Sequence, residues 1–93
     1  MNKLLLAALI LAVTAAAQTD SGSIRILVED PSSSTVSAAR VILTNTATGV
    51  VTTRDTGDEG YAVFSPIIRG SYTAEVRKAG FQTTKVTGLT LEV

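Results

Sequence analysis

Three carboxylates fall close together in one polar stretch of the sequence: Asp55, Asp58 and Glu59. Calcium takes oxygen ligands from acidic loops of this kind, so these residues are the candidate metal ligands of the chain. Their spacing does not match that of an EF-hand loop. Aspartate and glycine are also the residues that turns favour. A solvated acidic turn is therefore the stronger of the two interpretations.

The sequence contains few of the side chains that enzymes commonly use for catalysis. The 93 residues include no histidine and no cysteine, which removes the commonest general base, a thiolate nucleophile and Cys-ligated zinc. Ser32, Ser33 and Ser34 have no histidine or paired lysine to activate them, and G-x-S-x-G is absent. A glycosidase-type carboxylate pair is open on composition alone, but so small a module lacks the depth for a substrate cleft. We expect no enzyme, no catalytic residue and no cofactor.

Exposed aromatic faces are what a sugar-binding platform needs. Beyond the N-terminal segment the aromatic residues are Tyr61, Phe64, Tyr72 and Phe81. Only Tyr61, which is out of phase with Phe64, is expected to face solvent. An ordinary cross-strand contact is the plainer interpretation of that residue. Tyr61 is therefore a weak candidate for carbohydrate binding.

Length and charge restrict the possible partners. The chain has eight basic and eight acidic side chains, so its formal net charge is zero. Nucleic-acid binding normally needs a basic excess, so we expect no nucleic-acid partner. A chain of 93 residues can hold one compact domain at most.

The N-terminus has the three-part form of a secretory signal peptide. A basic tip, residues 1–3, precedes an apolar run over residues 4–13, and small residues stand at Ala15 and Ala17. A membrane-spanning helix would need about 20 apolar residues, and the polar Gln18 comes first. We predict a helical signal peptide over residues 1–17 and cleavage after Ala17. The mature chain is then exported, to the periplasm, the outer membrane or the outside of the cell, without a transmembrane helix.

The rest of the chain, residues 18–93, is rich in threonine and valine, which favour strands because β-branched side chains pack well on a pleated surface. Strand-like segments recur at short intervals between turn formers, and this pattern is typical of an all-β sandwich or barrel. The expected strands cover residues 23–29, 40–45, 50–54, 61–64, 71–78 and 83–93.

Alternation along these segments predicts which side chains face the interior. Gly60 and Gly70 stand where reversals of the chain would need a positive φ. Pro66 and Gly70 are expected to bracket a turn, and Gly88 suggests a bulge. The predicted core consists of Ile24, Ile26, Val28, Val41, Leu43, Phe64, Tyr72, Val76 and Phe81.

The order of these landmarks resembles the carboxypeptidase regulatory-like domain, a transthyretin-like β-sandwich grouped with carbohydrate-binding-like folds. The matching segments are residues 22–24, 29–32, 39–49 and 60–64, then Ile67 with residues 70–76 and 79–81. Ala62 departs from the family, which usually has an aromatic residue there, and residues 68–69 replace a Pro-Pro pair. The family pattern also continues beyond residues 88–93 into one more strand. The resemblance therefore implies a sandwich that lacks its last strand and has an unpaired edge, which favours association.

A signal peptide followed by such a domain resembles the N-terminal end of large TonB-dependent outer-membrane receptors. The resemblance implies a non-enzymatic interaction or scaffold module, whose partner is another protein or the rest of a receptor. In that case the chain is a fragment or a stand-alone remnant of a periplasmic extension. A solitary secreted spacer fits almost as well, and a carbohydrate-binding module is the alternative function.

Overall fold

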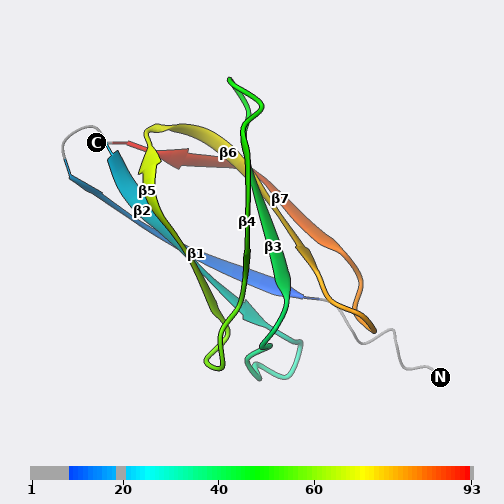
Figure 1. The fold of residues 1–93 in the computed structure, drawn as a ribbon. Helices are drawn as coiled ribbons and strands as arrows, with labels where there is room; N and C mark the ends of the chain where they lie inside the picture. Colours follow the sequence, from blue (N-terminus) through cyan, green and yellow to red (C-terminus); the bar gives the residue numbers. More distant parts are fainter. Residues whose placement is uncertain (1–8, 19–20, 93) are drawn as a thin grey trace.

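The protein is an all-β sandwich, as the sequence predicts. The computed structural model describes residues 9–18 and 21–92 (Figure 1). Two antiparallel sheets have the strand orders β1-β2-β5 and β4-β3-β6-β7. Within the described residues, no helix has the length and apolarity to cross a bilayer. The strands are β1 (Ile10–Gln18), β2 (Ser21–Glu29), β3 (Arg40–Asn45), β4 (Val51–Asp55), β5 (Tyr61–Ile68), β6 (Gly70–Arg77) and β7 (Thr84–Leu91).

Strand β5 is longer than the sequence predicts. It continues from Tyr61 through Pro66 to Ile68, so Pro66 lies in the strand and not in a turn. Proline is tolerated there because β5 is an outer strand of its sheet. The register with β2 also shifts next to this point, between Gly22 and Ile24. An edge position and an irregular ladder together make room for a residue without an amide donor.

The core lies between the two sheets and follows the predicted alternation. In β2 and β6 every second side chain is buried, as expected for strands with one face toward the interior. Phe81 is the exception to the predicted core, because it is only partly buried and packs against the core from the turn after β6. The buried predicted residues are Ile24, Ile26, Val28, Val41, Leu43, Phe64, Tyr72 and Val76.

Two buried polar side chains hold the loops onto this core. Thr56 donates its hydroxyl to the carbonyl of Val36 at 2.7 Å and accepts from the amide of Ala39 at 2.9 Å. The Oδ1 atom of Asn45 accepts from the amides of Ala47 and Thr48. Both residues satisfy backbone groups that would otherwise be left without partners in loops.

The corner before β5 requires glycine at position 60 for two reasons: the backbone φ is positive, and there is no room for a side chain. Gly60 has a φ of +83°, and a Cβ there would lie 2.8 Å from Cβ of Thr35 and 3.1 Å from the carbonyl oxygen of Val28. The amide of Val28 also donates to the carbonyl of Gly60 at 2.9 Å. The predicted positive φ is confirmed, and close packing is a second reason for glycine at this position.

Strand β1 comes from the segment that the sequence assigns to the signal peptide. Residues 1–8 of that segment lie outside the described residues, and the part from Ile10 onward is extended, not helical. Figure 1 shows this strand, in blue, along β2 in cyan. The register is antiparallel and continuous from the pair Ile10 and Glu29 to the pair Gln18 and Ser21. The sheet edge that would be open without this segment is therefore paired in the full chain, and cleavage after Ala17 stays a prediction.

Replacing Gly60 tests the corner. We expect Gly60→Ala to lower the free energy of unfolding by about 2 to 4 kcal/mol, because it adds a left-handed residue and a close contact. Gly57→Ala is the matched control, since a Cβ at Gly57 meets open space. Chemical denaturation followed by circular dichroism gives both values, and equal stabilities would contradict the proposed packing.

Replacing Tyr72 tests the core. Its side chain is 5% exposed, and its hydroxyl donates to the carbonyl of Ile68. Tyr72→Ala should cost about 3 to 5 kcal/mol, typical of aromatic truncation in a core. Tyr72→Phe removes only the hydrogen bond and should cost about 1 kcal/mol. Thermal melting separates the two variants, and an unchanged midpoint for Tyr72→Ala would mean that the core is elsewhere.

Candidate functional site

The three carboxylates of the predicted calcium site separate into two places. Asp55 ends β4, whereas Asp58 and Glu59 lie in the turn before β5. Asp58 and Glu59 border an open hollow of about 490 Å³ together with Arg25 and Tyr61. Among the residues that the structure describes, no three acidic side chains are grouped closely enough to hold a metal ion. The geometry favours the interpretation of a solvated turn.

Tyr61, the carbohydrate candidate, is half-buried and already has a partner on its ring. The guanidinium carbon of Arg25 lies 3.8 Å from the ring centroid, in the range of a cation–π contact. This contact follows from the β2–β5 register, which pairs Arg25 with Val63 and Leu27 with Tyr61. One face of the ring is therefore occupied by a cation, and the single tyrosine is a poor platform for a sugar.

The serines after β2 take part in a turn. The Oδ1 atom of Asp30 accepts from the amide of Ser32 at 2.9 Å, from its hydroxyl at 2.7 Å, and from the amide of Ser34 at 3.0 Å. The hydrogen bond from the Ser32 hydroxyl is the main reason that the pKa of Asp30 is lowered, and the bonds from the backbone amides add to it. These contacts order the loop between β2 and β3.

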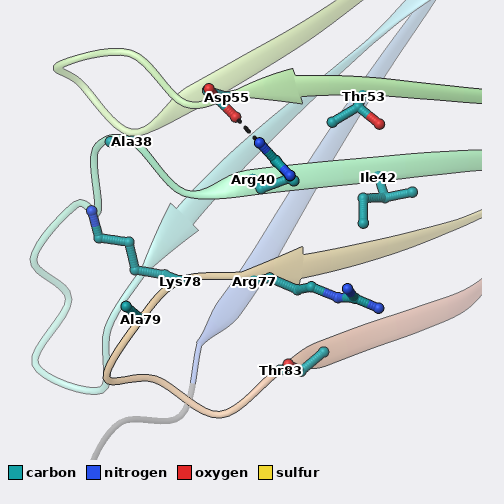
Figure 2. Close-up of a pocket in the computed structure, with 9 residues that line it drawn as sticks. All are labelled: Ala38, Arg40, Ile42, Thr53, Asp55, Arg77, Lys78, Ala79 and Thr83. Carbon is teal, nitrogen blue, oxygen red and sulfur yellow. Dashed lines mark ion pairs between the residues drawn. The ribbon is translucent and has the colours of Figure 1, made fainter.

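A basic hollow, which the sequence analysis did not anticipate, opens at one end of the four-stranded sheet (Figure 2). It measures about 580 Å³. Its cations are Arg40 at the start of β3, Arg77 at the end of β6 and Lys78 directly after β6. Asp55, from the end of β4, contributes the carboxylate.

Each of the three cations already has a partner. Nε of Arg40 lies 3.9 Å from Oδ1 of Asp55, and both side chains are about two-thirds exposed. Arg77 contacts Oε2 of Glu75 at 3.1 Å, and Nζ of Lys78 donates to the carbonyl of Ser37 at 3.0 Å. Exposed ion pairs contribute little to stability, about 0 to 1 kcal/mol each. With three cations and one carboxylate, the hollow can attract an anion.

The register explains how residues far apart in sequence reach this hollow. Arg40 is opposite Asp55 on β4 and opposite Arg77 on β6. The outward positions at the ends of neighbouring antiparallel strands therefore meet on one surface. The available signal in the sequence was that Arg40 and Arg77 lie near the ends of predicted strands and that Asp55 directly follows another.

A second surface, at the other end of β4, is apolar. A groove of about 290 Å³ lies between the β3–β4 hairpin and the end of β5, and it is lined by Val50, Ile67 and Ile68 among others. Val50 is 61% exposed and Ile68 57% exposed. Val50 and Ile68 therefore place two exposed aliphatic side chains on the same surface.

Comparison with known families settles the classification. The family model of the carboxypeptidase regulatory-like domain matches residues 23–93. The chain belongs to this family. No curated protein and no solved structure matches the chain significantly. Regulatory-like domains are in general non-catalytic.

The family match covers only two of the three strands in the β1-β2-β5 sheet. The matched region begins at Ser23 and includes β3 to β7 and nearly all of β2. Strand β1, which ends at Gln18, lies wholly outside it. The strand that pairs with one edge of β2 is therefore not part of the carboxypeptidase regulatory-like domain proper.

The turn at Asp30 gives a prediction about pH. Because the folded-state pKa of Asp30 is lowered, ionised Asp30 stabilises the domain above its unfolded pKa of about 3.9. That stabilisation is lost as the pH falls through the lower folded value. Ser32→Ala should raise the pKa of Asp30, because the largest of its causes is removed. Ser33→Ala is the control. NMR titration of the Asp30 carboxyl measures both, and equal shifts in the two variants would contradict the assignment.

Proposed function

We propose that the protein is an exported, non-catalytic interaction module that forms the N-terminal extension of a TonB-dependent outer-membrane receptor. The observation that carries the proposal is the sequence of residues 1–17, which has the form of a signal peptide and directly precedes a domain of the regulatory-like family. An exported module placed first in a receptor contacts either the rest of that receptor or a separate protein.

The two described surfaces support an interaction role over a catalytic one. In the apolar groove, Val50 and Ile68 present aliphatic side chains to solvent. In the basic hollow, the charged side chains contact one another or backbone carbonyls, and the chain has no histidine or cysteine to add reactivity. Such surfaces can bind a partner by burial of apolar area and by charge, and no step of bond cleavage is required.

Two measurements test the proposal together: the position of N-terminal cleavage and the cellular fraction that contains the protein. An antibody against the domain should detect it in the outer-membrane fraction of the source cells, in a chain whose N-terminus is Gln18. Ala17→Asp should block cleavage, because the last position of the cleavage site needs a small residue. Ala16→Asp, at the permissive middle position, is the matched control. A cytoplasmic chain that begins at Met1 would contradict the proposal, and so would equal processing of the two variants.

A further inference from the structure

A pair of like charges lies on the outward face of the four-stranded sheet. Arg40 on β3 and Arg77 on β6 are directly opposite each other in the register, and both side chains are exposed. Like charges in this arrangement destabilise a sheet. On its other side Arg40 is opposite Asp55, so one carboxylate follows two arginines across the sheet. The stability of the sheet therefore does not explain why the two arginines are paired.

The nearby carboxylates compensate only part of this positive charge. Nε of Arg40 lies 3.9 Å from Oδ1 of Asp55, whereas a charge-assisted hydrogen bond is about 2.7 to 2.9 Å long. Arg77 directs Nε and Nη2 to the single atom Oε2 of Glu75, both at 3.1 Å. The side chains of Arg40 and Arg77 are nevertheless 64% and 59% exposed. With Lys78 included, three cations lie beside two carboxylates.

The hollow around these cations fits a short stretch of peptide. Its volume is about 580 Å³, and Ala38, Ile42 and Ala79 line it together with the charged side chains (Figure 2). The planar guanidinium of arginine matches the geometry of a carboxylate. Nucleic acids and anionic membranes bind to extended basic surfaces, whereas this chain has no net charge. A peptide with a few carboxylates therefore complements the hollow better than either of them.

We propose that the basic hollow binds an extended acidic segment of a partner protein, with one carboxylate between Arg40 and Arg77 and a second beside Lys78. Asp55 then competes with the segment for Arg40. The segment is recognised by its charges, and every residue that lines the hollow lies between positions 38 and 83. Such binding deepens the proposed interaction role and rests on it, but it requires neither export nor cleavage.

The probe is a capped heptapeptide that alternates glutamate with alanine, titrated into the full chain and followed by nitrogen-15 NMR. The Nε–H signals of Arg40 and Arg77 should shift, while that of Arg69 stays in place. The same peptide with glutamine instead of glutamate should have no effect. Affinity for the glutamate peptide should fall severalfold as the salt concentration rises from about 0.05 to 0.5 M. If the glutamate peptide shifts neither Arg40 nor Arg77, the proposal is wrong.

Removal of a cation from the hollow should weaken binding. Arg40→Gln and Arg77→Gln should each lower the affinity for the glutamate peptide roughly tenfold, because each removes a charge-assisted contact. Arg69→Gln is the matched control, since it removes the same charge from an exposed arginine between β5 and β6 that is not part of the hollow. Circular dichroism verifies that the variants are folded. Equal affinity in all three variants would overturn the proposal.

Removal of the carboxylate from the hollow should have the opposite effect. Asp55→Asn should tighten binding of the glutamate peptide about two- to fivefold, because the peptide no longer competes with Asp55 for Arg40. Asp58→Asn is the matched control, since it removes an exposed carboxylate that borders the other hollow. Weaker binding in Asp55→Asn than in Asp58→Asn would contradict competition for Arg40 and, with it, the proposed site.

Other anions serve as competing probes. Vesicles of phosphatidylglycerol and phosphatidylcholine should leave the signals of Arg40 and Arg77 in place. Shifts caused by the vesicles and not by the peptide would replace the protein partner with a membrane surface. Inorganic phosphate should bind more weakly than the glutamate peptide, and equal affinity would mean an adventitious ion only.

Peptide binding and cellular location fail independently. A chain that binds the glutamate peptide in solution but stays in the cytoplasm would contradict the proposed function and support the acidic partner. An exported and cleaved chain that does not bind the peptide would overturn the acidic partner and leave the proposed function in place.

Discussion

Pairing of β2 along both of its edges is the interaction on which the rest of the structure depends. Ile24, Ile26 and Val28 are the apolar face of one sheet and are buried almost completely. The backbone of β2 pairs with β5 on one side and with β1 on the other. A buried backbone group without a partner costs about 1 to 3 kcal/mol, which is a large share of the stability of a small domain. The core therefore requires that something covers each edge.

The outer strands show that this requirement is particular to β2. Strand β4 carries mostly exposed side chains, including Arg54 and Asp55, and β5 contains Pro66 near its end. Charges and proline at an edge are the usual means of preventing further pairing. Lys85 occupies an exposed position on β7. Strand β2 has Arg25 and Glu29 on its outward face, but its inward face is aliphatic throughout. Its edge is therefore protected by pairing with β1 and not by charges or proline.

Much of the fold could be predicted from sequence because the strands have a strict period of two. Strands β3 and β6 lie where alternation places them, to within a residue, and eight of the predicted core residues are buried. The predictions that Phe81 belongs to the buried core and that the strand from Tyr61 ends at Phe64 were wrong for a common reason. Both lie where a strand meets a turn, and there the local pattern does not record which neighbouring strand is available for pairing.

The surfaces were harder to predict than the core. The basic hollow depends on the register of three strands, which brings Arg40 beside Asp55 and Arg77. No local motif contains that register, since the three residues are far apart in the chain. The acidic cluster shows the opposite case, because Asp55 and Asp58 are near in sequence and yet border different hollows. Two residues that are close in sequence did not share a site where a strand ended between them.

Strand β1 illustrates a limit of a different kind. An uninterrupted apolar run is the form of a signal peptide, and its alternate residues Leu11 and Val13 also supply the inward face of a strand, so the same residues fit both descriptions. Both descriptions concern the full chain: the structure pairs this segment with β2, and cleavage after Ala17 stays a prediction.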